Sequence, residues 1–544
     1  MTARYSPRTP RPSGISSWRV VEARGPASRR ATIGGMEQPA AGDPPWAAHL
    51  PPGLDSGRIE LLEGQSLVRR WTRRWLEEPG RPTLWDDRLG WRTAGDLERS
   101  SRLVAARLHR AGLRPRDRIL FSASPSTTVV GTYVGALRLG LTVVPVNTAY
   151  RQGEVAHITL DAEPRGAVVD DPERAGWIRQ ATGDAIVVTP EVDLPDGPVP
   201  DLDACGPDDP ALICYTSGTT GTPKGALLRH GNLLANAEAL RLAWRWTASD
   251  RLVLALPLVH VHGLCAGLHG TLLAGASALI LPRFDVETVL DVAHRHGASL
   301  FFGVPTMYSR LAASPRVGEL GRLRLCVSGS APLPPAVFER VAEASGQRIL
   351  ERYGMTETLM NVSNPYDGER RPGTVGLPLP AVEVRLASSP EGEILVRGPN
   401  VFGGYWRNES ATAVVFDHEG WFHTGDVGDL DEAGYLRVVG RSRELIITGG
   451  FNVYPREVED VLLSHPGVVE AAVVGTPSEE WGEIVTAVVV ADEPRPDTDD
   501  LLRMAAERLA PFKRPRLVRY VDSLPRNSMG KVRRDQLSDQ LTEG

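Results

Sequence analysis

Apolar positions along this chain follow two alternating spacings from about residue 62 onward. In residues 94–112 they recur at the spacing of one helical face, and the pattern stops at Gly112. An apolar run at 118–123, a second helical pattern at 127–140 and another apolar run at 141–146 follow. This succession predicts βαβ units and a largely parallel sheet buried between helices.

The same rhythm continues as far as residue 328 and indicates a large first domain. Further strands are expected at 211–214, 252–256, 278–281, 300–302 and 323–328, and further helices at 230–244 and 286–296. Because 544 residues are too many for one compact core, at least two domains are expected. We predict an α/β N-terminal domain with parallel-rich sheets and flanking helices over residues 46–440.

The pattern changes near residue 440, where a smaller unit begins. Its first expected helix, 454–464, has Pro455 near its start and places Val458, Val461 and Leu462 on one face. After it we expect strands at 468–475 and 484–490, a helix at 499–509 and a strand at 517–521. These elements predict a small α+β C-terminal domain over residues 441–544.

Residues 1–45 have a different composition, rich in Arg, Pro, Ser, Gly and Ala, with almost no acidic residue before Glu37. They lack the apolar core of a secretory signal. Pro10, Pro12 and Pro26 argue against the amphipathic helix of a mitochondrial presequence. We expect a disordered extension, or a start codon assigned upstream of a real start at Met36.

The overall composition is that of a globular protein, with 42% hydrophobic and 24% charged residues. No apolar run approaches the ~20 residues of a membrane helix. A net charge of -6 gives no electrostatic reason to expect nucleic acid as a partner. Four cysteines without CxxC spacing suit a reducing cytosol, so a cytoplasmic location is expected.

Lysine is rare in this chain: the 61 basic residues include only Lys224, Lys513 and Lys531. Arg has replaced Lys almost everywhere, as codon bias in a GC-rich genome would produce. Because a compact ammonium and a planar guanidinium are not interchangeable, a retained Lys marks a site that needs this residue, unless it has survived by chance.

The strongest local motif is the run Tyr215-Thr-Ser-Gly-Thr-Thr-Gly-Thr-Pro-Lys-Gly225, between an expected strand and an expected helix. Its glycines let the backbone turn with N–H groups exposed, and its hydroxyls and Lys224 add further donors. Such a loop binds the oxygens of a polyphosphate. It lacks the Gly-Lys-Ser/Thr end of a Walker A loop. A solvated Ser/Thr/Gly linker is the alternative interpretation.

This loop resembles the signature of the adenylate-forming superfamily, which comprises acyl-CoA synthetases, luciferases and the adenylation domains of peptide synthetases. Further motifs follow in the family's order and extend the resemblance over residues 62–535. They are Ser328-Gly-Ser-Ala-Pro-Leu333, Glu351-Arg-Tyr-Gly-Met-Thr-Glu357, Trp421-Phe-His-Thr-Gly-Asp426, Gly440-Arg-Ser-Arg-Glu-Leu445, Gly449-Gly-Phe-Asn-Val-Tyr-Pro455 and Pro525-Arg-Asn-Ser-Met-Gly-Lys531.

The resemblance implies that an acid is activated with ATP as an acyl-adenylate. Glu357 would hold Mg²⁺, and Thr356 would contact the α-phosphate. Asp426 would accept hydrogen bonds from the ribose hydroxyls, reinforced by Arg441. Lys531 would bridge the substrate carboxylate and the α-phosphate, where two anions meet. The implied ATP site comprises Thr216, Ser217, Gly218, Thr219, Thr220, Gly221, Lys224, Ser328, Gly329, Ser330, Glu351, Arg352, Tyr353, Gly354, Met355, Thr356, Asp426 and Arg441. For each charged residue among them, the alternative interpretation to a role in the ATP site is a solvated charge on the surface.

Two other kinds of site are weak candidates. The chain has no Gly-x-Ser-x-Gly elbow for an acyl-serine enzyme. The pair His260-Val-His262 could suggest a metal, but its spacing and the lack of a third ligand nearby make that interpretation weak. The resemblance instead assigns His260 to the wall of the acyl pocket.

The substrate is indicated by a more specific resemblance. The run Glu351–Gly376, with His260-Val-His-Gly-Leu264 and Gly303-Val-Pro-Thr-Met-Tyr308, resembles malonyl-CoA synthetases, which use malonate and often methylmalonate. Their pocket carries an arginine for the second carboxylate, and Arg283 stands at the matching position. A buried carboxylate needs such a partner, and a fatty acid would leave the cation unpaired. A surface position at a strand end is the alternative for Arg283. The predicted acyl pocket comprises Arg283, His260, Gly303, Ser330 and Met360.

The acceptor expected from the resemblance is coenzyme A. The chain ends 13 residues after Lys531, so no fused carrier domain is expected. Loading of a separate carrier protein, and activation of another short, medium-chain or aryl acid, remain alternatives. Two other functions were considered. A luciferase shares the motifs but would need a luciferin pocket, which the interpretation of Arg283 disfavours. A non-enzymatic ATP sensor would have no need for both Lys531 and the Gly449-Gly450 segment.

The superfamily's small domain rotates between the two half-reactions, so a mobile C-terminal domain is expected. Arg443 matches the hinge position, where Lys or Asp is common. After rotation, Gly449, Gly450 and Phe451 would line the channel for the arm of coenzyme A. The segment ending at Lys531 also has the form that lysine acetyltransferases modify in relatives, which makes such an enzyme a possible regulatory partner.

Overall fold

The computed structural model describes residues 32–33, 36–37, 43–216, 223–388, 391–441, 444–449, 451–478, 480–527 and 531–542. Most of the predicted extension 1–45 lies outside this part of the chain. The same holds for the predicted site residues Ser217, Gly218, Thr219, Thr220, Gly221, Arg443 and Gly450.

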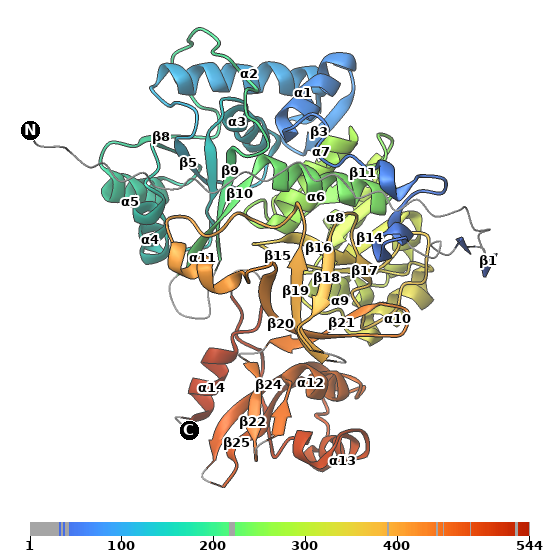
Figure 1. The fold of residues 1–544 in the computed structure, drawn as a ribbon. Helices are drawn as coiled ribbons and strands as arrows, with labels where there is room; N and C mark the ends of the chain where they lie inside the picture. The colour runs from blue at the N-terminus through green and yellow to red at the C-terminus, as the bar shows by residue number, and fades with distance from the viewer. Residues whose placement is uncertain are drawn as a thin grey trace, which may run out of the picture.

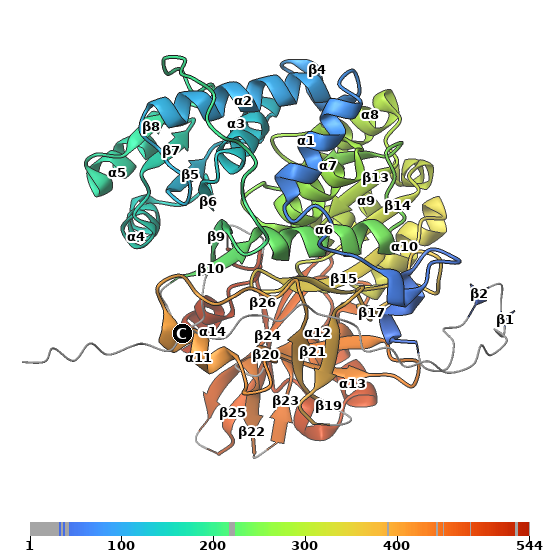
Figure 2. The same ribbon diagram turned by 45° about the horizontal axis from the view of Figure 1, so that its top comes forward.

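The first sheet has six strands and is parallel except at one edge, where β10 runs antiparallel to β9. Its order is β10 (Lys224–Arg229), β9 (Pro210–Thr216), β6 (Thr142–Pro145), β5 (Arg118–Ser122), β7 (Gly166–Val169) and β8 (Ile186–Val188). Figure 2 shows two helices on each side of it: α2 (Ala94–Arg110) and α3 (Thr127–Arg138), then α4 (Gln152–Ala162) and α5 (Pro172–Thr182). The predicted βαβ rhythm is confirmed here.

The second sheet has nine strands, parallel in the centre and antiparallel at both edges. Its order is β17 (Leu377–Pro378), β16 (Leu359–Ser363), β15 (Leu350–Met355), β14 (Leu325–Ser328), β13 (Leu300–Gly303), β11 (Arg251–Leu254), β12 (Ser277–Ile280), β3 (Pro82–Asp86) and β4 (Gly90–Thr93). Because β15, β14, β13, β11 and β12 are parallel, the loops after their carboxyl ends lie along one edge, where open α/β sheets bind ligands.

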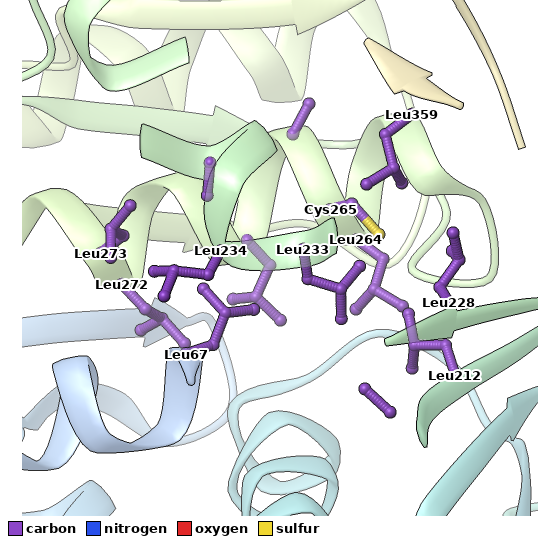
Figure 3. Close-up of a cluster of buried hydrophobic side chains, with 14 of the residues drawn as sticks. Leu67, Leu212, Leu228, Leu233, Leu234, Leu264, Cys265, Leu272, Leu273 and Leu359 are labelled. Carbon is purple, nitrogen blue, oxygen red and sulfur yellow. The ribbon is translucent and has the colours of Figure 1, made fainter. Parts of the chain in front are cut away.

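One hydrophobic core joins the two sheets. Leucines from both sheets and from the helices between them meet in it, as Figure 3 shows for Leu67, Leu212, Leu233, Leu264 and Leu359. These side chains come from helices α1 (Leu67–Glu77) and α6 (His230–Ala243), from the π-helix η3 (His262–His269), and from strands β9 and β16. The core therefore fixes the second sheet, and the loops at its edge, relative to the first.

The remaining helices of this domain are short. They are α7 (Gly270–Ala274), α8 (Val286–His296), α9 (Pro305–Ala313), α10 (Pro335–Ser345), α11 (Glu409–Val415) and the 3₁₀ turns Pro45–His49, Ser56–Arg58 and Val317–Arg322; the strands β1 (Thr32–Ile33) and β2 (Met36–Glu37) pair near the N-terminus. The predicted helix 286–296 is confirmed by α8 with the same bounds.

A third, antiparallel sheet follows and was not predicted from the sequence. It consists of β18 (Glu383–Leu386), β19 (Glu391–Arg397), β20 (Phe422–Leu430) and β21 (Leu436–Arg441) in chain order. Its strands are half-buried and show no clean alternation of apolar and polar positions, which explains why the pattern gave no signal. This sheet carries Asp426 and Arg441.

The C-terminal elements form a separate core. A five-stranded sheet holds β22 (Ile446–Thr448), β23 (Phe451–Val453), β24 (Val468–Ser478), β25 (Gly482–Ala491) and β26 (Leu517–Tyr520). The helices are α12 (Pro455–Leu463), α13 (Thr498–Arg508) and α14 (Arg534–Thr542), with a 3₁₀ turn at Pro511–Lys513. Val458 and Leu462 of α12 are buried in this core, as their spacing predicted. Figure 1 shows the unit at one end of the molecule, where α12 contacts β21.

Two observations bear on the expected environment. Within the described residues, none of the helices combines the length and apolar character that a membrane crossing requires. The cysteines Cys205, Cys214, Cys265 and Cys326 are all buried thiols. The cytoplasmic location remains a prediction.

Candidate active site

Several predicted site residues of the large domain lie at the carboxyl edge of the second sheet. His260 and His262 follow β11, Gly303 ends β13, Ser328 ends β14 and Arg352 lies in β15. Register aligns these positions, because Gly303 pairs with Ser328 and Ser328 pairs with Glu351 across the parallel strands. Residues that are far apart in the sequence are thus brought together by the order of the strands.

Asp426 is held by two partners from different elements. Its Oδ2 accepts a hydrogen bond of 2.6 Å from the Tyr353 hydroxyl, and its Oδ1 lies 2.9 Å from Nε of Arg441. Asp426 and Arg441 face each other directly across β20 and β21, and the Asp426 N–H donates to Thr424 Oγ1 at 3.0 Å. Burial and the neighbouring carboxylate raise the pKa of Tyr353, so it remains a neutral donor. The carboxylate therefore has a fixed orientation.

Glu357 is a buried carboxylate next to the ends of the predicted phosphate loop. Its Oε1 accepts a hydrogen bond of 3.0 Å from the Tyr405 hydroxyl. The Lys224 ammonium lies 5.5 Å from the centre of the Tyr405 ring, and Lys224 pairs with Thr216 where β10 and β9 flank residues 217–222. Burial raises the pKa of Glu357. A nearby cation would offset that effect.

This arrangement fits a Mg²⁺ ion held partly by substrate. Magnesium in nucleotide enzymes is typically bound by one or two carboxylates together with phosphate oxygens, which Glu357 beside the loop would provide. Among the described residues, no three His, Cys, Asp or Glu side chains come close enough to hold a metal by themselves.

The turn that presents Thr356 and Glu357 depends on a close approach of backbone. A Cβ on Gly354 would lie 2.1 Å from the Leu359 carbonyl oxygen, so only glycine fits. Leu359 itself has a left-handed backbone with φ of 55°, as does Ser330 at 73° in the loop after β14. Left-handed residues other than glycine cluster at functional sites, where the surrounding structure holds them.

Lys531 reaches this site from the C-terminal domain. It is partly buried and lies within electrostatic reach of Arg441, Asp426, Glu357 and His260. Burial, and then repulsion by Arg441, lower the pKa of Lys531 to about 8. The structure therefore brings Lys531, Asp426 and Glu357 together although they come from three separate motifs.

The predicted channel residues Gly449 and Phe451 make their contacts within the C-terminal domain. The Gly449 N–H donates to the Trp481 carbonyl at 2.9 Å, and the Phe451 ring stacks on Phe512 at 4.5 Å. Phe451 is 51% exposed. In this arrangement Lys531 is within electrostatic reach of residues of the large domain, while the contacts described for Gly449 and Phe451 lie within their own domain.

Several polar side-chain atoms at the acyl end of the site are buried and have no hydrogen-bond partner within the part of the chain that the structure describes. They are His260 Nε2, His262 Nε2, Ser328 Oγ, and Nε and Nη2 of Arg352. Burial lowers the pKa of His260 to about 4 and also lowers that of His262 well below its usual value, so both rings are neutral near pH 7. Buried polar groups are normally satisfied, so this cluster indicates a ligand position.

Two predicted acyl-pocket residues, Arg283 and Met360, have opposite environments. Arg283 lies in the turn between β12 and α8, is exposed, and is close to Asp285. Its exposure differs from the burial expected for it, because the chain turns to the surface after β12, and its contact with the acid stays a prediction. Met360 is fully buried in the core of the large domain. Arg352, predicted beside the nucleotide, is the buried arginine of this edge.

Two contributors were missed from the sequence. Tyr405 lies 48 residues from the Glu357 that it contacts, and no local pattern connects them. His262 was considered only as a metal ligand, but its Nδ1 lies 3.4 Å from Ser330 Oγ, and its ring stacks on Phe302 with centroids 6.3 Å apart. His262 also begins η3, and single π-turns often occur at functional sites.

Comparison with known families agrees with this geometry. Residues 71–406 match the family described as AMP-binding enzyme, and residues 457–531 match the AMP-binding enzyme C-terminal domain. The chain therefore belongs to the AMP-binding enzymes, and the resemblance to adenylate-forming enzymes is confirmed.

Individual relatives define the activity more closely. The feruloyl-CoA synthase of an Amycolatopsis species is 37% identical over 81% of this chain and 92% of its own length. The malonate–CoA ligase of Arabidopsis thaliana is 35% identical over 78% of each chain. The protein is thus an AMP-forming acyl-CoA ligase, an acid–thiol ligase that uses ATP, Mg²⁺ and coenzyme A.

Solved structures show the same fold. ATP-bound MatB from Rhodopseudomonas palustris is 40% identical, with a TM-score of 0.84 over 88% of this chain and 99% of its own. A malonyl-CoA ligase with methylmalonyl-CoA and AMP bound is 42% identical, with a TM-score of 0.61 over 82% and 97%. The predicted α/β fold with a smaller C-terminal domain is confirmed by these similarities.

Proposed function

We propose that this enzyme converts malonate or methylmalonate and coenzyme A to the corresponding thioester, with AMP and pyrophosphate as the other products. The observation that carries the proposal is the acyl end of the site, where polar atoms of His260, His262, Ser328 and Arg352 are buried and have no hydrogen-bond partner among the described residues. An aryl or long-chain acid would bury apolar surface against these groups and leave them unpaired, which is costly. A short acid with a second carboxylate would satisfy them. Similarity to a malonyl-CoA ligase supports the same choice.

In the first half-reaction, a carboxylate oxygen attacks the α-phosphorus of ATP, and the bond to pyrophosphate breaks. Lys531 would sit between the two anions and stabilise charge on the pentavalent phosphorus. Thr356 would donate to the α-phosphate, and Asp426 would accept from the ribose. Glu357 would hold Mg²⁺, which neutralises phosphate charge when bound. The enzyme needs no protein nucleophile, because the substrate supplies one.

In the second half-reaction, the thiol of coenzyme A releases its proton to solvent and the thiolate attacks the acyl carbon. The bond between the acyl carbon and the phosphate oxygen breaks, and AMP leaves with the electron pair. We propose that the C-terminal domain first rotates about Arg443, so that Lys531 withdraws and Gly449, Gly450 and Phe451 line the thiol's path. The present contacts of Lys531 with the site, and of Gly449 and Phe451 within their own domain, fit the arrangement for adenylation.

Acetylation of Lys531 would regulate the same step. It would remove the charge of the ammonium and leave a neutral amide where two anions must meet. A lysine acetyltransferase is therefore the regulatory partner that we propose. Because Lys531 is partly buried here, the modification would require the C-terminal domain to move away.

A substrate panel tests the proposed function. Malonate, methylmalonate, succinate, butyrate and ferulate are compared in separate assays of pyrophosphate release and of thioester formation. Malonate or methylmalonate should have the highest kcat/KM, and both products should form in equal amounts. A higher kcat/KM for butyrate or ferulate would contradict the proposal, and the protein would then be a ligase for a monocarboxylic acid.

A further inference from the structure

Residues 402–406 form a short stretch of chain, the brace segment, that contacts Glu357 at two points. The Phe402 N–H donates to the Glu357 carbonyl oxygen at 2.8 Å, and the Tyr405 hydroxyl donates to Glu357 Oε1 at 3.0 Å. The backbone and the side chain of Glu357 are therefore both held by the same segment. Because of this, the orientation of the carboxylate depends on where the brace segment lies.

The brace segment also pairs with strand β10, which begins at Lys224 near the end of the predicted phosphate loop. The Leu227 N–H donates to the Gly404 carbonyl oxygen at 3.1 Å. The Trp406 N–H donates to the Gly225 carbonyl oxygen at 2.7 Å. These two hydrogen bonds join the segment to the strand in an antiparallel bridge. One piece of backbone thus links the end of the loop to the predicted magnesium carboxylate.

The position of Tyr405 is also fixed by helix α11. The Tyr405 N–H donates to Thr412 Oγ1 at 2.9 Å. The preceding Gly404 has φ of 132°, and a Cβ there would lie 2.6 Å from Cγ2 of Thr412, so the close approach to α11 requires glycine. The Tyr405 ring contacts the Phe402 ring edge-on, with centroids 5.0 Å apart. The place of the tyrosine is therefore set by several elements at once.

Tyr405 offers a different contact to each of two opposite charges. Its hydroxyl donates to the Glu357 carboxylate, while the Lys224 ammonium lies over its ring, 5.5 Å from the ring centre. An aromatic face attracts a cation, and a hydroxyl is a hydrogen-bond donor for a carboxylate. Since a tyrosine is neutral near pH 7, neither contact cancels the charge of the partner. A direct ion pair between Lys224 and Glu357 would cancel both charges.

We propose that Tyr405 is a positioning residue for the complex of ATP with Mg²⁺. It holds the Glu357 carboxylate and the Lys224 ammonium at a fixed separation and prevents them from pairing with each other. One charge is thereby kept for the metal and the other for phosphate oxygens. The role of Tyr405 rests on the proposed function, in which Glu357 would hold Mg²⁺. It means that the magnesium dependence of ATP binding is set by a residue that acts through Glu357.

Two variants separate the hydroxyl from the ring: Tyr405→Phe removes only the hydroxyl, and Tyr405→Leu removes both contacts. Tyr435→Phe is the matched control, because the Tyr435 hydroxyl donates to the Glu369 carbonyl oxygen at 3.0 Å and Arg371 lies 4.0 Å from the centre of its ring. Tyr435 therefore combines the same two kinds of contact with other partners. ATP affinity is measured from the rise in unfolding temperature, once with Mg²⁺ and once with EDTA.

The loss in Tyr405→Phe should depend on magnesium. With Mg²⁺, ATP binding should weaken about tenfold, the scale of losing one hydrogen bond to a charged group, and with EDTA by less than about threefold. Tyr405→Leu should weaken ATP binding under both conditions, because the contact with Lys224 is lost as well. Tyr435→Phe should bind ATP as wild type does.

Kinetics provide a second measurement, in assays of pyrophosphate release with the preferred acid. Tyr405→Phe should need about tenfold more Mg²⁺ than wild type for the half-maximal rate, while kcat at saturating Mg²⁺ should fall by less than about threefold. Recovery at high Mg²⁺ is expected because the carboxylate is still present and only its orientation is less restricted. A loss of kcat that no Mg²⁺ concentration restores would contradict the proposal.

A double substitution tests whether the hydroxyl acts through the carboxylate. Glu357→Gln alone should lower the Mg²⁺-dependent part of ATP binding, and adding Tyr405→Phe should lower it no further, since both changes remove the same link. An additive loss would overturn the proposal. An equal loss with Mg²⁺ and with EDTA in Tyr405→Phe would also overturn it. So would a lower unfolding temperature of the free protein with unchanged Mg²⁺ dependence, which would show a packing role beside Phe402.

Failure of the proposed function is seen separately. If Glu357→Gln binds ATP with Mg²⁺ as wild type does, Glu357 does not hold the metal, and the role of Tyr405 fails with that assignment. If Glu357→Gln loses the Mg²⁺ dependence but Tyr405→Phe keeps it, only the role of Tyr405 is wrong. The binding assays contain no acid substrate, so both results are independent of the choice between malonate and another acid.

Discussion

At the scale of single residues, the site is defined by charges that are held apart from water. Asp426 and Glu357 are each buried and each accept a hydrogen bond from a tyrosine hydroxyl, which fixes their orientation before any substrate binds. Lys531 is within electrostatic reach of Asp426 and Glu357. Among the described contacts, it forms a salt bridge with neither carboxylate. A pre-oriented site of this kind stabilises charge in the transition state without rearranging.

The charge of Lys531 should be required for adenylation. Lys531→Ala is expected to lower malonate-dependent pyrophosphate release by roughly 10²–10³-fold, the cost of removing one transition-state donor. It should still convert supplied malonyl-adenylate and coenzyme A to thioester. Lys513→Ala is the control, because Lys513 pairs with Glu457 at 2.6 Å in the same domain. Equal loss of both half-reactions in Lys531→Ala would argue against separate arrangements for the two steps.

The same lysine should limit activity at alkaline pH. Since its pKa is lowered to about 8, Lys531 is charged below that pH and loses its proton as the pH rises through it. We expect kcat/KM for pyrophosphate release, which reports on the free enzyme, to fall above pH 8. Lys531→Arg should be slower but show no such fall up to about pH 10, because Arg stays charged. An identical alkaline limb in both proteins would exclude Lys531 as its cause.

At the scale of elements, the order of strands in the second sheet decides which loops meet. The loops after β11, β13 and β14 lie on one edge because these strands run parallel to β15, in the order β15-β14-β13-β11. The hairpin of β20 and β21 then adds Asp426 and Arg441 from a different sheet. Each loop contributes one or two polar groups, and the rigid sheet holds them in place.

The turn between β15 and β16 should tolerate no side chain at Gly354. The added Cβ of Gly354→Ala would lie 2.1 Å from a backbone oxygen, so the turn must shift. We expect a loss of about 1–3 kcal/mol in the free energy of unfolding, measured by urea denaturation, together with lower activity as Glu357 moves. Gly153→Ala on α4 is the control, because nothing lies within 4 Å of its Cβ. Wild-type stability and activity in Gly354→Ala would contradict this account of the turn.

At the scale of the whole molecule, two domains with separate cores share one site. Lys531 comes from the C-terminal domain, while its charged neighbours Asp426 and Glu357 belong to the large domain. The sheet changes between β21, which ends at Arg441, and β22, which begins at Ile446. Only a short stretch of chain therefore has to change conformation when one domain moves relative to the other.

A proline in that stretch should separate the half-reactions. Arg443→Pro fixes one backbone angle at the predicted hinge, which lies outside the described residues. Pyrophosphate release, measured with hydroxylamine to trap the adenylate, should remain close to wild type, while thioester formation should fall by at least about tenfold. The reverse result, or no effect on either step, would count against rotation at this position.

Much of this architecture was available from the sequence. The βαβ rhythm predicted the parallel sheets and most of the helices, because apolar spacing reports directly which face of an element is buried. The seven motifs predicted the chemistry through their resemblance to the adenylate-forming superfamily, and the loop of residues 215–225 also did so through residue types that bind phosphate. The scarcity of lysine also directed attention to Lys224 and Lys531. Lys224 lies over the ring of Tyr405, which donates to Glu357, and Lys531 is within electrostatic reach of Glu357.

Tertiary structure alone decided the rest. The third sheet has no clear apolar pattern, and the contact of Tyr405 with Glu357 spans 48 residues, so neither could be found locally. Most clearly, the sequence could not distinguish a buried arginine from an exposed one. Arg283 and Arg352 both lie near apolar strands, but only the packing of β14 against β15 encloses Arg352 beside Gly329. Burial is a property of neighbours that are distant in the sequence, and it is burial that makes a cation require a ligand.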